Sequence, residues 1–405
     1  MSHSPVRLRV YMMDLLATVP YYTAYLSRAL LQHGVDVSVG SITYYLDLHC
    51  FDSRGLTLKP GCMDVVGRFP RLPRTLRRLL KVAETALNHG ALGAKFLVRP
   101  PDVLHVQFLP MFLSRAPMDL WLMRLAQRRG ARVVLTVHDL MPHNTADLHR
   151  AKFEDLYRSV DRLICHSDSI RARLQTEFGI ANEQVDVIPH GPFFYDLPLA
   201  DEDGVRKGYG IADGQQLVLW QGILSAYKGL DLLLEAWAAV EAEFAGATLV
   251  VVGTGSTELT DAVRAQVTRL GLHRVVLDLR FTSTEELVAL YRAASVVVYP
   301  YRAITTSGAL ATGVALGKTI VASDLPVFRE LLTNEEDALL VEPGDVEALG
   351  RAMLRVLQDA GLRERLAAAV RQKEFGSESW KSIAAQTEQV YVKACAAGSR
   401  ERSAA

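Results

Sequence analysis

Residues 299–330 read YPYRAITTSGALATGVALGKTIVASDLPVFRE, and this stretch decides how the rest of the chain is interpreted. It begins at the end of an apolar strand and passes through a polar turn. Gly308 then opens a short apolar helix that stops at Gly317, and a second apolar strand follows at 319–322. Strand, turn, helix and strand in this order are typical of a parallel α/β sheet.

The turn before this helix predicts a phosphate site. It carries Thr306 and Ser307 directly before Gly308. Ser307 is a suitable N-cap, and Gly308 allows an anion to approach the backbone closely. The free N–H groups at a helix start lie at the positive end of the helix dipole, which favours phosphate. The alternative is an ordinary capped helix that binds nothing.

Length and composition narrow the class of protein. The chain has 405 residues, of which 49% are hydrophobic, and this length suits two domains of about 200 residues each. Lys plus Arg and Asp plus Glu both total 45, so nothing in the net charge indicates a nucleic-acid partner. The four cysteines are widely spaced, which argues against a disulfide framework or a zinc site and for a cytoplasmic location. No apolar run is long enough to predict a membrane span.

The N-terminal half predicts a parallel sheet with one candidate functional histidine. A strand, helix and strand pattern starts near Arg7, and its first turn carries no GxGxxG, so a nicotinamide-cofactor site is not supported there. His138 follows the apolar strand at 132–137. Ligands of open α/β sheets sit beyond the carboxyl ends of strands, which makes His138 a candidate. The alternative is a structural, hydrogen-bonded histidine.

A second loop of the phosphate-binding kind opens the C-terminal half. The strand at 216–220 leads into a loop that contains Gly222 and Lys228, and a helix follows from Leu230. A lysine directly before a helix start supplies positive charge where the backbone supplies N–H groups. The alternative is a surface lysine, because the spacing of a P-loop is absent.

The stretch from Arg68 to Lys81 is strongly basic. It interleaves six basic residues with leucines, contains no acid, and can form a helix from Pro73 onward. This pattern predicts a surface that touches an anionic membrane or lipid phosphates. The alternative is a surface helix that packs through its leucines and leaves its arginines in water.

Taken together, the motifs resemble one family. They are TVHD at 136–139, VIPHG at 187–191, GILSAYKGLDLLLEAW at 222–237, LVVVGTG at 249–255, ELVALYRAASVVVYPY at 286–301 and GKTIVASDLP at 317–326. In this order they are similar to the family 4 (group 1) retaining glycosyltransferases, which have the GT-B fold. The resemblance covers most of the chain.

The resemblance implies an α/β fold with two Rossmann-like parallel-sheet domains that face each other across a cleft. Residues 1–195 would bind the acceptor and residues 205–378 the donor. A C-terminal helix at 379–396 would cross back to the N-terminal domain. The resemblance also implies which residues form the site. His138 and Lys228 would be the catalytic groups, and Phe281 to Ser283 would lie beside the base. The residues around the donor would be Gly222, Lys228, Thr306, Ser307, Gly308, Ala309 and Thr312.

The implied reaction moves a sugar from a UDP or GDP sugar to an acceptor hydroxyl, with retention and with no metal or cofactor. The basic stretch suggests a lipid-linked or polysaccharide intermediate as the acceptor, at the inner membrane face. One alternative is a non-catalytic GT-B subunit that has lost donor chemistry, because Ile223, Ile304 and Thr312 stand where the family usually has an arginine and two glutamates. A second is a sugar-nucleotide epimerase, against which the missing carboxylates count.

Overall fold

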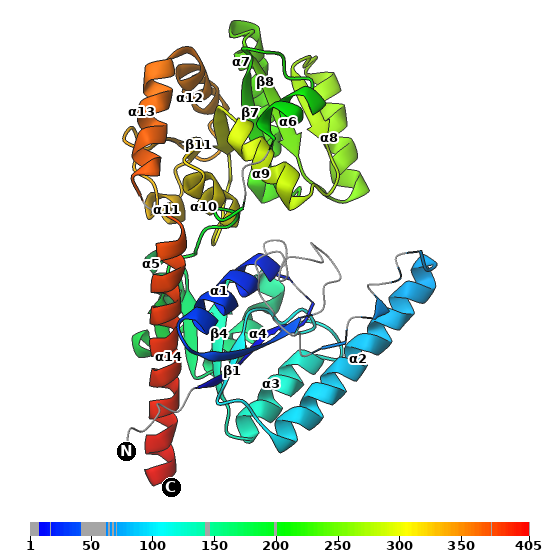
Figure 1. Cartoon of the computed structure of the whole chain (residues 1–405), viewed down its shortest axis with the longest axis vertical. Helices are drawn as coiled ribbons and strands as arrows, with labels where there is room; N and C mark the ends of the chain where they lie inside the picture. The colour runs from blue at the N-terminus through cyan, green and yellow to red at the C-terminus, as the bar shows by residue number, and fades with distance from the viewer. Residues whose placement is uncertain are drawn as a thin grey trace. The chain divides into compact units, whose positions relative to one another are not determined.

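The computed structural model describes residues 8–16, 18–41, 62–63, 65–66, 69, 71–141, 146–197, 201–373 and 375–404. Arg68, the first residue of the basic stretch, lies outside them. The chain divides into two compact units, Met1–Pro189 with Trp380–Ala405, and His190–Ser379. Figure 1 shows the course of the chain.

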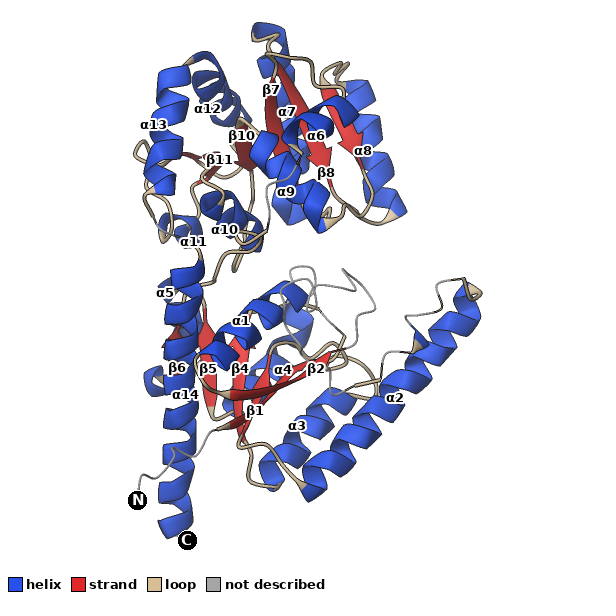
Figure 2. Ribbon diagram, viewed as in Figure 1, coloured by secondary structure: helices blue, strands red, loops and turns tan. Residues whose placement is uncertain are grey.

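The first unit contains a six-stranded parallel sheet in the order β2-β1-β3-β4-β5-β6 (Figure 2). Its strands are β1 (Arg9–Asp14), β2 (Asp36–Ser41), β3 (Val103–Val106), β4 (Arg132–Val137), β5 (Arg162–Cys165) and β6 (Val185–Val187). The strands are mostly apolar and buried on both sides, as expected where helices cover both faces of a parallel sheet.

Helices cover both faces of this sheet. They are α1 (Pro20–Gln32), α2 (Arg74–Val98), α3 (Met118–Arg128), α4 (Ala146–Arg158), α5 (Asp168–Phe178) and α14 (Ser377–Ala404), with the short 3-10 helix η3 (Asn182–Gln184). Apolar residues of α2 to α5 share one core cluster with the sheet. On the other side, α1 and α14 meet through Tyr25 and Trp380, whose rings stack with centroids 5.4 Å apart.

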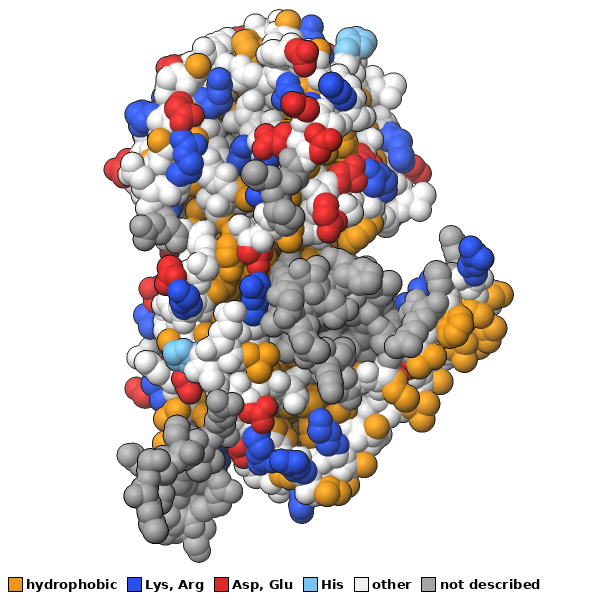
Figure 3. Space-filling model, viewed as in Figure 1, with side chains coloured by type: hydrophobic (Ala, Val, Ile, Leu, Met, Phe, Trp, Pro, Cys, Tyr) orange, Lys and Arg blue, Asp and Glu red, His pale blue; other side chains and the backbone are white. Residues whose placement is uncertain are grey.

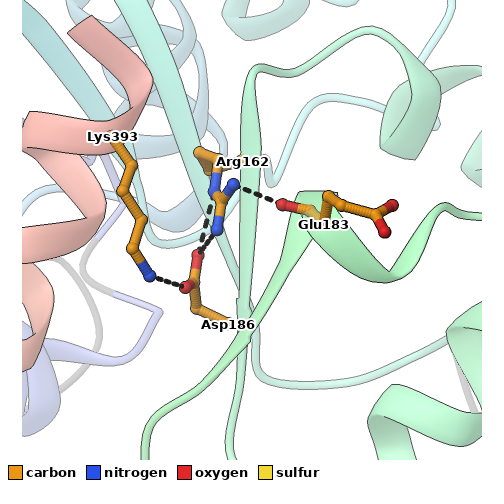
Figure 4. Close-up of polar contacts among 4 residues, drawn as sticks. All are labelled: Arg162, Glu183, Asp186 and Lys393. Carbon is orange, nitrogen blue, oxygen red and sulfur yellow. Dashed lines mark hydrogen bonds and ion pairs between the residues drawn. The ribbon is translucent and has the colours of Figure 1, made fainter. Parts of the chain in front are cut away.

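Helix α14 is also tied to the edge strand β6 by charged side chains (Figure 4). Lys393 on α14 donates to one carboxylate oxygen of Asp186 at 2.9 Å. Arg162 on β5 donates from Nε to the other carboxylate oxygen, also at 2.9 Å, and its Nη1 donates to the carbonyl of Glu183. The last helix therefore belongs to the first unit from Trp380 onward.

The second unit contains another six-stranded parallel sheet, in the order β12-β11-β10-β7-β8-β9. Its strands are β7 (Gln216–Gln221), β8 (Ala247–Val252), β9 (Val275–Asp278), β10 (Val296–Tyr299), β11 (Thr319–Ser323) and β12 (Ala338–Val341). The strand order reverses between β7 and β10, and such a reversal opens a crevice at the carboxyl ends of the two strands.

The helices of this unit are α6 (Glu202–Gly208), η4 (Ala226–Lys228), α7 (Leu230–Glu243), α8 (Thr257–Arg269), α9 (Thr284–Ala293), α10 (Gly308–Ala315), α11 (Pro326–Arg329), α12 (Val346–Gln358) and α13 (Ala360–Arg371). Residues of α7, α8 and α12 form the core on one face of the sheet, and residues of α6, α9 and α10 form it on the other. Helix α13 contributes to both clusters.

The basic helix departs from one of its two sequence-based interpretations. Within the basic stretch, the leucines of α2 are exposed: Leu76 to 44%, Leu79 to 69% and Leu80 to 39%. Further along the helix, Leu92 is buried in the core. Figure 3 shows hydrophobic side chains gathered along this helix. For the basic stretch, the alternative of a surface helix that packs through its leucines is therefore wrong.

Candidate functional site

The candidate donor site lies where the strand order of the second sheet reverses. The loop after β7 and the loop after β10 leave neighbouring parallel strands at the same edge of the sheet. A backbone hydrogen bond joins the two loops, because Arg302 N–H donates to the carbonyl of Tyr227 at 2.7 Å. The sequence predicted phosphate-binding features in both loops, and the structure brings them together.

Two glycines hold the loops at this edge in close backbone contact. Gly229 has a left-handed φ of +63°, and a Cβ atom there would lie 1.9 Å from the carbonyl oxygen of Pro300. Gly253, after β8, has a φ of +155°, and its Cβ would lie 1.9 Å from the carbonyl oxygen of Gly222. Only glycine allows these contacts, so three loops are fixed against one another.

Lys228 ends the short helix η4 and directs its ammonium group onto Gly222. A Cβ on Gly222 would lie 2.4 Å from Nζ of Lys228, so the glycine makes room for the lysine. The ammonium has no hydrogen-bond or ion-pair partner among the residues that the structure describes. Desolvation by the surrounding protein lowers the pKa of Lys228 to about 8. A desolvated cation without a carboxylate partner is suited to receive an anion.

The loop after β10 leads into helix α10, which has a capped and polar N-terminus. The Ser307 hydroxyl accepts the N–H of Leu310 at 3.1 Å, as an N-cap does. The preceding N–H groups, of Gly308 and Ala309, have no partner within the helix and lie at its positive end. Phe193 covers one side of this start, because a Cβ on Gly308 would lie 2.6 Å from its ring.

A buried tyrosine pair supports the first turn of α10. Tyr299 on β10 donates to the carbonyl of Ala309 at 2.7 Å, and Tyr291 on α9 donates to it at 3.1 Å. Gln221, the last residue of β7, donates to the Tyr291 hydroxyl at 3.0 Å. No sequence pattern points to these hydrogen bonds, because the tyrosines stand at apolar positions of a strand and a helix, where their hydroxyl groups give no periodic signal.

The structure corrects the expectation for Thr312. Its side chain is only 2% exposed, and its hydroxyl donates to the carbonyl of Gly308 at 2.8 Å within α10. It therefore stabilises the first turn of the helix instead of facing a ligand. Thr306, in the loop before the helix, is half-buried.

Arg302, after β10, and Arg329, on α11, could supply the positive charge that Ile223 does not, but both are already paired. Arg302 donates to both carboxylate oxygens of Asp231, at 2.7 and 2.6 Å. Arg329 forms an ion pair with Asp324. At the arginine position of the family, Ile223 leaves 59% of its surface exposed. Lys228 is therefore the unpaired cation of these loops within the part of the chain described.

The loop after β9 offers an aromatic group at the same edge of the sheet. Phe281 is 47% exposed, and Ser283 caps α9 by accepting the N–H of Glu286 at 3.2 Å. The hydroxyl of Thr282 is buried and makes no hydrogen bond to the described residues. An exposed ring at a strand end is suited to stack on a flat ligand.

In the first unit, His138 follows β4 and is buried in a hydrogen-bonded cluster. Its side chain is 5% exposed, its Nε2 lies 2.9 Å from Oε1 of Gln107, and its Nδ1 lies 3.4 Å from Nε2 of His166. His166 Nδ1 donates to the carbonyl of Ile188 at 3.0 Å. Burial lowers the pKa of His166 to about 4, so its ring is neutral and its Nε2 accepts.

This cluster continues to the C-terminal helix. Gln107 donates to Nε2 of His105 at 3.1 Å, and Nδ1 of His105 lies 2.6 Å from the Tyr391 hydroxyl on α14. Burial lowers the pKa of His105 to about 3, so this ring is neutral as well. Gln107 and His166 directly follow β3 and β5, the neighbours of β4. The rule that singled out His138 would have found both.

Asp14, at the carboxyl end of β1, is a further buried ionisable group. It accepts the N–H of Thr18 at 2.8 Å, the N–H of Val19 at 3.2 Å and the hydroxyl of Thr23 at 3.0 Å. Desolvation outweighs these bonds and raises the pKa of Asp14 to about 6. Among the described residues, no group of three or more His, Cys, Asp or Glu has the arrangement of a metal site.

Two family profiles match the chain, one on each half. The profile "Glycosyltransferase Family 4" matches residues 19–191, and "Glycosyl transferases group 1" matches residues 215–359. The chain belongs to the family 4, group 1 glycosyltransferases. The family read from the sequence motifs is therefore confirmed, and retention stays a prediction.

Two curated relatives illustrate the similarity of this glycosyltransferase to others. An uncharacterized glycosyltransferase of Methanocaldococcus jannaschii is 27% identical over 248 residues, which are 60% of this chain and 63% of that protein. The match thus spans less than two thirds of that relative's length. The phosphatidyl-myo-inositol mannosyltransferase of Mycolicibacterium smegmatis is 28% identical over 305 residues, 73% of this chain and 72% of that protein.

Among solved structures, Anabaena HepE in complex with UDP-glucose has a similar fold. The TM-score is 0.72 at 17% sequence identity, with 95% of this chain and 100% of that chain covered. Together with the two parallel six-stranded sheets, this likeness confirms the GT-B fold. No helix among the residues described is long and apolar enough to span a membrane.

Proposed function

We propose that this glycosyltransferase takes a sugar from a nucleoside diphosphate sugar and transfers it to an acceptor hydroxyl. The observation that carries the proposal is the unpaired, desolvated ammonium of Lys228 at the reversal point of the second sheet. The capped start of α10, on the adjacent loop, adds N–H groups from Gly308 and Ala309. Lys228 would contact the diphosphate, and the helix start would cap its distal phosphate.

This arrangement suits the chemistry of the leaving group. As the glycosidic bond breaks, negative charge grows on the nucleoside diphosphate, and preorganised positive groups stabilise it. Gly222 keeps the backbone clear beside the ammonium, and the exposed ring of Phe281 would flank the base. Retention would follow from a front-face route, in which the departing phosphate takes the proton of the acceptor. His138 would orient the sugar or donate a hydrogen bond to it.

UDP is the first donor to test, because Anabaena HepE was solved with UDP-glucose. For the acceptor, we propose a lipid-linked intermediate. A relative named phosphatidyl-myo-inositol mannosyltransferase supports this class of acceptor, as does the basic stretch of Arg68 to Lys81, which would contact an anionic membrane.

The second candidate is a GT-B subunit without donor chemistry. It is favoured by Ile223, which exposes an apolar side chain where the family usually has an arginine, and by Ile304, which packs against the apolar core. Binding of a nucleoside diphosphate and release of free sugar from its conjugate would exclude this candidate.

A thermal-shift titration with UDP, GDP and their sugars tests the donor site. A ligand that binds the folded state only stabilises it by about 2.7 kcal/mol at a hundredfold excess over Kd. Lys228→Ala should remove most of this shift, because a charge-assisted hydrogen bond contributes about 1.5–3 kcal/mol. Lys207→Ala, at an exposed lysine of the same unit, is the matched control and should keep it. An equal shift in both variants would refute the proposed role of Lys228.

A further inference from the structure

Helix α2 turns an uninterrupted apolar face away from the rest of its unit. The large exposed side chains are Leu76 (44%), Leu79 (69%), Leu80 (39%), Val82 (61%), Leu87 (61%), Leu97 (49%) and Val98 (86%). On the same side of the helix, the other exposed residues are small: Ala83, Ala86, Gly90, Ala91 and Ala94. At 100° per residue these positions form one stripe, about 33 Å long from Leu76 to Val98. Figure 3 shows this apolar surface along α2.

Polar residues on the inward side fix this orientation. The buried carboxylate of Glu84 accepts the N–H groups of Val65 and Val66, at 2.5 and 3.3 Å. Asn88 accepts the N–H of Met63 at 2.7 Å and donates to its carbonyl at 2.8 Å. Rolling the helix to bury its leucines would break all four bonds and leave buried polar groups unpaired. The outward apolar stripe is therefore a property of the fold.

The charges around the stripe are positive. Arg78 and Lys95 are exposed on α2, and Arg71 and Arg99 are exposed just beyond its two ends. The single acid of the helix, Glu84, is only 5% exposed and faces inward. An apolar stripe with cations at its edges and no exposed acid matches the interface of a bilayer that carries anionic lipid.

We propose that the outward face of α2, from Leu76 to Val98, lies in the plane of an anionic membrane surface with its leucines among the acyl chains. This extends the membrane contact proposed above, and it holds whether or not the donor site acts as proposed. The contact at the basic stretch is electrostatic, whereas here insertion of the apolar stripe supplies most of the affinity and the cations add to it.

A second copy of the chain fits this face less well. Antiparallel pairing about the middle of the stripe would place Arg78 of one copy opposite Lys95 of the other, and parallel pairing would place Arg78 opposite Arg78. No exposed acid on α2 offsets either contact. Like charges placed together disfavour such an interface.

Co-sedimentation of the full chain with vesicles tests the proposal. The protein should bind phosphatidylcholine vesicles and bind more tightly when phosphatidylglycerol is added. The double variant Leu79→Glu with Leu87→Glu should lose roughly a hundredfold in affinity, since two leucines no longer insert. Leu148→Glu is the matched control, because Leu148 is 79% exposed on another helix of the same unit, and its binding should be unchanged.

Three outcomes would overturn the proposal. The first is that the protein binds neither kind of vesicle. The second is that the leucine double variant binds fully, while the double variant Arg78→Ala with Lys95→Ala loses binding. The third is that the protein binds no vesicle but forms a dimer, which the leucine double variant dissociates. If the double variant does not fold, Leu87→Trp serves instead: brominated acyl chains should quench the added fluorescence, and no quenching refutes insertion. A UDP thermal shift on the same samples reports on the donor site separately.

Discussion

At the scale of single residues, the proposed contact of Lys228 with the diphosphate would make donor binding depend on pH. Burial lowers the pKa of its ammonium to about 8, and a bound diphosphate would hold the proton on. Affinity for UDP should therefore be constant near pH 7 and fall as pH rises through 8, by at most tenfold per pH unit. Isothermal titration at pH 7, 8 and 9 measures this. Lys228→Ala should bind weakly with a flat profile, and a flat profile in the native protein would contradict the assignment.

The buried carboxyl group of Asp14 should make the stability of the fold depend on pH. Its pKa is 3.8 in the unfolded chain and about 6 in the fold, so the folded state binds the extra proton between these values. The stabilisation is complete below about pH 4 and is lost as pH rises through 6, a change of roughly 3 kcal/mol. Urea unfolding of the native protein and of Asp14→Asn at pH 4, 5 and 7 checks it. The difference in the free energy of unfolding between the two proteins should change by that amount from pH 4 to pH 7. A difference that does not vary with pH would refute the prediction.

At the scale of elements, the loops of the candidate donor site depend on glycine. Gly229→Ala should destabilise the second unit by more than 2 kcal/mol, about the sum of left-handed strain and a backbone clash with Pro300. Gly271→Ala isolates the strain, because Gly271 has a φ of +65° with no atom within 4 Å of its Cβ position. Chemical denaturation of both variants measures the difference. Equal losses would show that the contact with Pro300 is unimportant.

The sequence indicates the main residues of the candidate donor site but not the residues that support them. Lys228, Ser307 and Gly308 stand out because a strand, a glycine and a helix start follow one another, a local pattern. Thr312 was assigned to ligand binding from a family position, but in this chain its short side chain reaches only the Gly308 carbonyl. Tyr291 and Tyr299 were hidden because apolar periodicity does not separate a tyrosine that donates from one that only fills space.

The orientation of α2 shows the same difference between what local sequence patterns predict and what tertiary contacts decide. The sequence predicted a helix from Pro73 with a basic and an apolar face, and α2 has both. Which face lies inward depends on Glu84 and Asn88. They bond to the backbone of Met63, Val65 and Val66, which are tertiary contacts that no periodicity encodes. The end of the first strand likewise gave no sign that Thr18 and Val19, just before α1, and Thr23, at its start, would donate to Asp14.

At the scale of the whole molecule, the C-terminal helix packs on the first unit, so a substitution in this helix should weaken that unit and not the second. Trp380 is 2% exposed and stacks on Tyr25, so Trp380→Ala should cost the first unit about 3–5 kcal/mol. Trp237, fully buried on α7, is the counterpart in the second unit. Scanning calorimetry should show each variant lowering a different transition, by roughly 10 °C. If both variants lower one shared transition, the two units unfold together.

The close backbone contacts of Gly229 and Gly253 also limit which positions can change when the preferred nucleotide sugar changes. Because Gly229 and Gly253 each touch a neighbouring carbonyl, neither position accepts another residue without moving two loops at once. The exposed side chains of Ile223 and Phe281 carry no such restraint. Selection for a new nucleotide sugar, in nature or in the laboratory, would therefore accumulate its changes at those two positions and leave the glycines untouched.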